Sequence, residues 1–363
     1  MSDWDFILAP ATVDVQIVLD EVAIISNSFK LLRAEEFHDG LHEWIQTTAH
    51  KLSPQQAEMS KRIASYIDHF VVETQAKTYP EFIRAINDIA PERLYDFALQ
   101  WMRDKEGYPG DETLLKDKTA YLDFLQQATA EKYARRGDSF NYEHWEKEWM
   151  ILQNPQKFLE DTTIHLQFMW DTFLKAEWQR VKPILQEAVS AFESVDYSGM
   201  NAYDAIEAVT GRNMRGKEFF EQQLEKTERL IFMPNAHLGP YISWGNSPDE
   251  RTMVFFFGAR PPKNATIQST ALSRSELLVR LNALADETRL KILEMLTEHD
   301  ELCAQDFINE LDLSQSSASR HLRQLTASGY LNERRRDVAK CYSINPERLE
   351  DTIHALKVFL KKA

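Results

Sequence analysis

The stretch "LSQSSASRHLRQLTASGYL", residues 313–331, has the pattern of a short amphipathic helix. Apolar residues recur at Ala318, Leu322 and Leu325, the spacing of one face of an α-helix. Ser314 is a typical N-cap residue, and a glycine such as Gly329 commonly follows the last turn of a helix. The stretch therefore predicts a helix that packs one face against a core and presents the other face outward.

The opposite face of this helix is polar and basic, with Ser316, Arg320 and Arg323 at helical spacing. An α-helix fits the major groove of DNA, and arginine reads guanine through two hydrogen bonds. Serines near the start of the helix let it approach phosphates and base edges closely. We therefore predict that this face contacts DNA.

The flanking segments complete a known arrangement of elements. Upstream, residues 273–298 predict two amphipathic helices, the second capped by Asp286, and "AQDFINEL" predicts a short helix before the turn. Downstream, "YLNERRRDVAKCYSIN" reads as a strand, a charged turn and a second strand, and Pro346 begins a final helix. This order predicts a winged helix-turn-helix domain.

The net charge of −15 is not evenly distributed along the chain. Residues 1–272 contain 28 Lys+Arg and 42 Asp+Glu, whereas residues 273–363 contain 14 and 15. Residues 313–343 contain six basic and two acidic residues. Since a DNA-binding protein needs positive charge only at its contact face, the acidic composition does not exclude DNA binding.

Three stretches resemble the ArsR-type winged-helix regulators, a family of cytoplasmic bacterial and archaeal proteins: "LNALADETRLKILEML", "LSQSSASRHLRQLTASGYL" and "RRRDVAKCYSINPE". The resemblance covers about residues 273–363. It implies a homodimer built by the first and last helices of the domain, insertion of the helix matching Ser314–Ser328 into the major groove, and repression from a near-palindromic operator. The DNA-binding residues that we predict are polar or basic residues of this helix and of the wing: Ser314, Gln315, Ser316, Ser317, Ser319, Arg320, His321, Arg323, Arg334, Arg335, Arg336 and Lys340.

Metal-sensing members of the family commonly carry Cys-x-Cys in the segment that matches "ELCAQDF", whereas Cys303 here is followed by Ala304 and Gln305. A lone thiolate cannot close a soft-metal site, so we predict no bound metal and no cofactor. The chain has two cysteines, Cys303 and Cys341, which we expect to be reduced and not to staple the fold. A metal or thiol sensor through Cys303, with His299 nearby, remains an alternative.

The first 260 residues predict an α-rich regulatory domain. Proline-containing breaks separate helical segments between residues 20 and 228, and three β-rich segments between 229 and 258 predict a small antiparallel sheet. The alternating segment Val13–Leu19 can join that sheet. The predicted fold class is therefore mainly α with small antiparallel β elements, with a regulatory domain at 1–260, a linker at 261–272 and the winged helix at 273–363.

The region between residues 140 and 180 is rich in aromatic side chains. Ligand pockets are mostly apolar, so these side chains are candidates for an effector site, although for any one of them a place in the core is the more probable interpretation. The candidate effector-binding residues are Trp145, Trp149, Phe168, Trp170, Phe173 and Trp178. The pair His38 and His42 in "FHDGLHEW" has chelating spacing, but no third ligand is evident, and we expect a solvated helix start.

The usual catalytic and nucleotide-binding motifs, GxSxG, GxGxxG, HExxH and the Walker loop, do not occur, so we predict no enzyme activity. No apolar run approaches the about 18 residues of a membrane helix, and we expect a cytoplasmic protein without a membrane partner. The partners we predict are double-stranded DNA, a second copy of the chain and a small apolar effector. The alternative is a DNA-anchored module whose acidic domain docks a partner protein.

Overall fold

The structure is a computed structural model of the 363-residue chain. It describes residues 13–33, 41–136, 139–215, 218–239, 241–247, 249–259, 277, 280–336 and 339–361. The chain divides into two compact units, which we call the helical unit (Glu21–Arg33 and Leu52–Ala176) and the sheet-and-wing unit (Met1–Asp20, Ala34–Lys51 and Glu177–Ala363).

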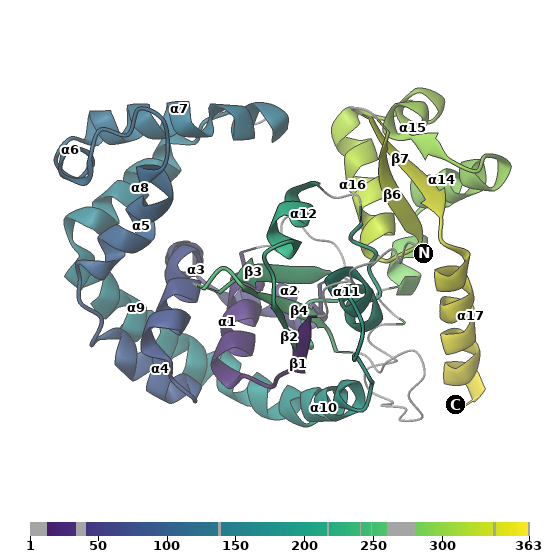
Figure 1. Cartoon of the computed structure of the whole chain (residues 1–363), viewed down its shortest axis with the longest axis horizontal. Helices are drawn as coiled ribbons and strands as arrows, with labels where there is room; N and C mark the ends of the chain where they lie inside the picture. Colours follow the sequence, from purple (N-terminus) through teal and green to yellow (C-terminus); the bar gives the residue numbers. More distant parts are fainter. Residues whose placement is uncertain are drawn as a thin grey trace, which may run out of the picture. The chain divides into compact units, whose positions relative to one another are not determined.

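The helical unit is built of helices (Figure 1). Its elements are α1 (Glu21–Leu31), α3 (Pro54–Thr74), α4 (Tyr79–Ile86), α5 (Arg93–Arg103), α6 (Asp111–Lys116), α7 (Lys118–Arg136), α8 (Tyr142–Gln153), α9 (Pro155–Met169) and the π-helical turn η1 (Trp170–Leu174). Pro54, Pro80 and Pro155 lie in the first turns of α3, α4 and α9, where a missing backbone N–H costs nothing. The predicted succession of helices with proline breaks is confirmed.

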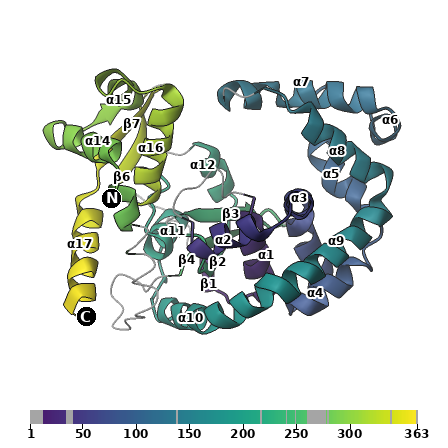
Figure 2. The same cartoon turned by 180° about the vertical axis from the view of Figure 1, so that it is seen from behind.

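Within this unit, α4 packs against α9, and α7 packs against α8, as Figure 1 and the reverse view in Figure 2 both show. Buried polar pairs join distant helices. The Tyr66 hydroxyl donates to a Glu148 carboxylate oxygen at 2.8 Å, and Ser60 Oγ lies 2.8 Å from His165 Nε2. Since buried polar atoms need partners, these pairs fix how α3 sits against α8 and α9.

The sheet of the other unit has four strands in the order β1-β2-β4-β3. The strands are β1 (Asp14–Ile17), β2 (Arg229–Asn235), β3 (Ile242–Asn246) and β4 (Thr252–Gly258). β1 joins the sheet as predicted, but the predicted antiparallel direction is wrong for most of it. β1, β2 and β4 are parallel, and only β3 pairs antiparallel. The reason is that β3 returns along the outer edge of β4, which leaves β2 and β4 adjacent and in the same direction.

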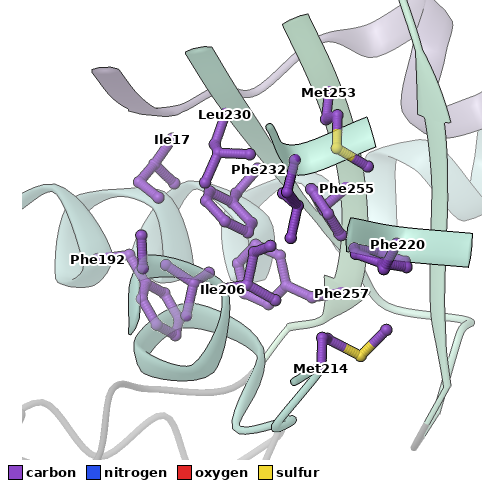
Figure 3. Close-up of a cluster of buried hydrophobic side chains, with 13 residues drawn as sticks. Ile17, Phe192, Ile206, Met214, Phe220, Leu230, Phe232, Met253, Phe255 and Phe257 are labelled. Atoms are coloured by element: carbon purple, nitrogen blue, oxygen red, sulfur yellow. The ribbon is translucent and has the colours of Figure 1, made fainter. Parts of the chain in front are cut away.

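One face of this sheet is covered by α10 (Lys175–Glu193), α11 (Ala202–Thr210) and α12 (Glu218–Leu224). Figure 3 shows the apolar side chains of the strands, including Phe232, Phe255 and Phe257, gathered with Phe192 and Ile206 of the helices. These five residues are at most 1% exposed. Burial of each such side chain stabilises the fold by about 1.5–3 kcal/mol, so this cluster anchors the sheet and its helices.

The C-terminal part of the chain is a winged helix, built from a helical segment at 280–284 and the elements that follow it. These are α14 (Glu287–Glu298), β5 (Leu302–Cys303), α15 (Ala304–Glu310), α16 (Gln315–Ala327), β6 (Leu331–Arg336), β7 (Ala339–Ile344) and α17 (Pro346–Lys361). The three strands pair antiparallel in the order β5-β7-β6. Ile292, Phe307, Leu325 and Tyr330 form the core of the domain and are 0% exposed.

The predicted fold class is confirmed at the level of a mainly helical protein with small sheets and a winged helix-turn-helix. The predicted linker 261–272 lies outside the described residues, and the predicted domain boundaries stay a prediction. None of the helices among the described residues combines the length and the apolarity that a bilayer crossing requires.

Candidate nucleic-acid interface

Helix α16 forms as its sequence predicts. Ser314 is the N-cap, and its side chain accepts a hydrogen bond from the Ser317 backbone N–H at 3.2 Å. Gly329, beyond the C-terminal end, has a φ of 82°, which favours glycine. The helix therefore begins and ends at the predicted signals.

The two faces of α16 are separated by burial. Ala318, Leu322 and Leu325 are at most 1% exposed, which confirms the predicted inward face. Ser317 is half-buried, and the remaining outward residues are exposed: Ser314, Gln315, Ser316, Ser319, Arg320 and Arg323. The helix thus offers three serines, a glutamine and two arginines on its exposed surface.

His321 is the one predicted DNA-binding residue of α16 that the structure buries. It is 6% exposed, and its Nδ1 lies 3.5 Å from an Asp286 carboxylate oxygen. It lies three residues after Ala318 and four before Leu325, and this spacing places it on the inward side of the helix, against the N-terminus of α14. We therefore remove His321 from the proposed contact surface.

A buried arginine that the sequence reasoning missed holds α16 in place. Arg289 of α14 is 8% exposed and donates from Nη1 to the Gln324 side-chain oxygen at 2.6 Å. It also donates from Nε to the Ala283 carbonyl at 2.6 Å and from Nη2 to the Asn282 carbonyl at 2.9 Å. Arg289 therefore ties three helical segments together. Because arginine side chains are rarely buried, the residue type at position 289 predicts an exposed side chain.

The wing carries the second group of predicted contacts. Arg334, 70% exposed, donates to both carboxylate oxygens of Glu301, from Nη2 at 2.9 Å, and Lys340 Nζ lies 3.0 Å from a Glu333 oxygen. The side chains of Arg335 and Arg336 lie outside what the structure describes. Exposed ion pairs of this kind contribute about 0–1 kcal/mol, so a DNA phosphate can compete for Arg334 and Lys340.

The winged helix is similar in sequence to known proteins. The model of the bacterial regulatory protein, arsR family, matches residues 286–333. The arsenical resistance operon repressor of Escherichia coli is 46% identical over 63 residues, which are 17% of this chain and 54% of that repressor. The arsenical resistance operon repressor of Staphylococcus aureus is 32% identical over 87 residues, 24% of this chain and 83% of that repressor. The chain belongs to the ArsR family.

A third relative, the transcriptional activator HlyU of Vibrio cholerae, is 32% identical over 90 residues, 25% of this chain and 82% of its own length. This ArsR-family chain spans about half the length, 54%, of the E. coli repressor it matches. The segment matched by the family model begins at the N-cap of α14, contains α16 and ends in β6. It therefore contains the exposed serines and arginines of α16.

The expectation that the two cysteines are reduced and do not staple the fold is wrong in this structure. Cys303 and Cys341 form a disulfide. The reason is the short strand β5, which no sequence pattern predicted: it pairs antiparallel with β7 and places the two residues directly opposite each other, with Cα atoms 3.7 Å apart. The disulfide joins the residue before α15 to the wing.

No group of three or more His, Cys, Asp or Glu side chains able to hold a metal ion occurs among the residues that the structure describes. Cys303 is engaged in the disulfide, and its backbone N–H donates to an Asp306 carboxylate oxygen at 2.7 Å. Asp306 therefore acts as part of the α15 cap.

The six aromatic residues predicted as an effector site do not gather in one place. Trp145 and Trp149 pack against the core of α5, α6, α7 and α8, and Trp149 Nε1 donates to the Leu114 carbonyl at 3.0 Å. Trp170 packs against Tyr79 with ring centroids 5.3 Å apart. Phe168 and Phe173 contact each other edge-to-face, and Trp178 belongs to the sheet-and-wing unit. Their aromatic character is explained by core packing, and their role as an effector site stays a prediction.

Proposed function

We propose that this ArsR-family chain is a sequence-specific DNA-binding transcriptional regulator, a repressor, that inserts α16 into the major groove. The observation that supports this most is the division of α16 into a packed face and an exposed face. Arg320 and Arg323 lie on the exposed face, and Arg289 and the apolar core hold the helix rigidly behind them. A rigid helix with outward arginines is what base reading in the major groove requires.

The proposed assembly is a homodimer on a near-palindromic operator. Two copies of the chain related by a two-fold axis present two α16 helices to half-sites one helical turn apart. Doubling the contacts raises affinity and specificity together. We propose that Arg334 and Lys340 of the wing, both exposed, contact DNA phosphates. Such contacts position the protein on the DNA without reading its sequence.

The proposal includes control by a small effector that binds in the part of the chain before the winged helix. Such control requires the effector to bind one dimer conformation better than the other, by about 1–3 kcal/mol of coupling free energy. The apolar character proposed for the effector rests on the aromatic content of this region.

Selection from a pool of random duplexes with the full chain tests this function. We expect enrichment of a duplex with two-fold symmetry and half-sites about 10 base pairs apart, because a symmetric dimer reads both halves alike. The measurement is sequencing of the retained pool after several rounds at moderate salt. Retention of duplexes without any common sequence would contradict the proposal.

A second candidate function, a thiol sensor, is favoured by the Cys303–Cys341 disulfide. Oxidation by a peroxide removes one hydrogen from each thiol, joins the two sulfurs and reduces the peroxide to two waters or to water and an alcohol. The bond would tie the start of α15 to the wing strand β7. Its formation or loss therefore acts on α15, which precedes α16, and on the wing, which follows it.

Removing this disulfide should lower the free energy of unfolding by about 2–4 kcal/mol, because the bond constrains the unfolded chain. The loop it closes corresponds to a sequence separation of 38. Urea unfolding and affinity for the selected duplex are measured for oxidised and reduced wild type and for Cys303→Ser. The control is that reductant leaves Cys303→Ser unchanged. Equal duplex affinities for oxidised and reduced wild type would exclude the sensor function.

A further inference from the structure

Three parallel strands of the sheet-and-wing unit end at one edge of the sheet. β1, β2 and β4 run in the same direction, and β2 continues into the turn at residues 236–239. This turn lies tightly against the end of β4, because a Cβ at Gly258 would lie 2.4 Å from the Gly239 carbonyl oxygen. In open sheets with parallel strands, ligands bind outside the carboxyl ends of the strands. This edge of the sheet is therefore a candidate ligand site.

A buried carboxylate lies at this edge. Glu177 of α10 is 7% exposed, and its Oε1 lies 2.7 Å from Nε2 of the equally buried His237. Arg180, one turn further along α10, donates to both carboxylate oxygens, from Nε at 2.8 Å and from Nη2 at 2.5 Å. Burial alone would raise the pKa of Glu177, but the hydrogen bonds from Arg180 and His237 outweigh it and lower this pKa to about 2.

Two further side chains complete the cluster: His42, which directly precedes α2 (Glu43–Lys51), and Trp44, in the first turn of α2. The Trp44 ring packs on the His237 ring with centroids 4.7 Å apart, and the His42 ring meets His237 edge-to-face at 5.6 Å. The His42 backbone N–H donates to the His237 carbonyl at 3.2 Å. The expectation of a solvated helix start is therefore wrong at His42, because this histidine is half-buried against the turn after β2; His38 lies outside the described residues.

The protonation of the cluster follows from these contacts. Burial lowers the pKa of His42 to about 4 and also lowers the pKa of His237, so both imidazoles are neutral at pH 7. His42 Nδ1 accepts from the Trp44 backbone N–H at 3.1 Å, which leaves the ring proton on Nε2. The charges of Glu177 and Arg180 cancel, so the cluster is neutral as a whole.

The groups left over at this cluster are hydrogen-bond donors. Nε and one Nη2 proton of Arg180 bind Glu177, so the Nη1 protons and the second Nη2 proton form a free donor edge on a side chain that is 50% exposed. Among the residues that the structure describes, none accepts from Arg180 Nη1 or from His42 Nε2. The cationic donor Arg180 and the neutral donor His42 suit a ligand with an anionic hydrogen-bond acceptor. The half-buried Trp44 ring suits a ligand whose acceptor is attached to a flat apolar group.

We propose that this cluster binds a small aromatic carboxylic acid, whose carboxylate pairs with the free edge of Arg180 and whose ring lies against Trp44. Glu177 and His237 are positioning residues, because they hold the guanidinium and the tryptophan at the edge of the sheet. That this acid is the effector of a regulator rests on the proposed function. The binding of an acid to the cluster does not depend on that function.

Isothermal titration calorimetry of the full chain, without DNA, tests the site with benzoate, phenylacetate and indole-3-acetate. We expect saturable binding of at least one acid. The matching neutral amide should bind at least about tenfold more weakly, because it lacks the charge that pairs with Arg180. Arg180→Lys keeps the charge but loses the two-pronged geometry, and it should weaken binding of that acid by about tenfold. The matched control is Arg215→Lys, since Arg215 is a 43% exposed arginine that is likewise engaged in ion pairs, here with Asp204 and Glu207.

The comparison of acid and amide uses only wild-type protein, so it holds even if Arg180→Lys fails to fold. No saturable binding of any of the three acids would overturn the proposal, as would equal binding of acid and amide. An unchanged affinity in a folded Arg180→Lys variant would also overturn it. Because no DNA is present in this titration, absence of acid binding would not affect the proposed selection of a duplex by α16, which is tested separately.

Discussion

The double variant Arg320→Ala, Arg323→Ala should bind the selected duplex more weakly by about 2–6 kcal/mol, because each base-reading arginine contributes about 1–3 kcal/mol. Both side chains are exposed on α16 and leave the packed face untouched. The measurement is a fluorescence-anisotropy titration of the labelled duplex at several salt concentrations. A base-reading arginine changes which bases are preferred, whereas a phosphate contact lowers affinity for all sequences and reduces the salt slope by about one.

A matched control separates the position of the charges from their number. Arg229→Ala, Arg251→Ala removes two exposed arginines of the sheet, which are 51% and 67% exposed and each paired with one carboxylate. This control should retain the wild-type affinity to within a factor of a few, because exposed charges away from the contact act only through screened fields. Wild-type affinity in the α16 variant would remove α16 from the DNA interface.

Replacing Arg289 with methionine should destabilise the winged helix by about 3 kcal/mol or more, because it leaves buried hydrogen-bond acceptors without donors. The acceptors are the Gln324 side chain and the carbonyls of Ala283 and Asn282. Hydrogen-exchange mass spectrometry of the full chain measures this loss of stability peptide by peptide. Peptides from α16 should lose about a hundredfold in protection, and affinity for the duplex should fall with them.

The control for this prediction is Lys291→Met, a neighbour on α14 that is 52% exposed and pairs with Glu287 one turn away. Such a surface pair contributes little, so exchange in α16 should stay at the wild-type rate. If Arg289→Met leaves the protection of α16 unchanged, Arg289 does not hold the recognition helix.

Local sequence signals predicted the winged helix well, because its elements are set by short-range chemistry. Ser314 and Asp286 cap the helices that they were expected to cap, and Leu322 lies on the inward face set by helical spacing. Charge and turn residues marked the wing in the same way. The burial of His321 was missed although helical spacing indicates it, since His321 lies three residues after Ala318 and four before Leu325.

Features that depend on how distant segments meet were not predictable from one sequence. The direction of β2 against β4 depends on which edge β3 occupies, and alternation of apolar residues does not encode that. The Cys303–Cys341 pair depends on a two-residue strand that is too short to leave a pattern. The aromatic residues of 140–180 were read as one site because they are close in sequence, whereas the fold distributes them among separate contacts.

The donor cluster at the sheet edge shows the same limit. His42, Glu177 and His237 come from a helix start, a helix interior and a turn after a strand, far apart in the sequence. A histidine two residues after the end of a strand, as in "FMPNAHLG", was the one available signal, since residues at the carboxyl ends of parallel strands often bind ligands. That signal requires the strand to be recognised as parallel.

The most direct test of the central claim is a competition measurement with the full chain at about 0.15 M salt, in which unlabelled selected duplex and unlabelled random duplex compete for the labelled selected site. The account predicts that the selected duplex competes at least about 10³-fold better than the random one, and that Arg320→Ala, Arg323→Ala removes most of that preference. Equal competition by the two duplexes with wild-type protein would contradict a DNA-reading role for α16.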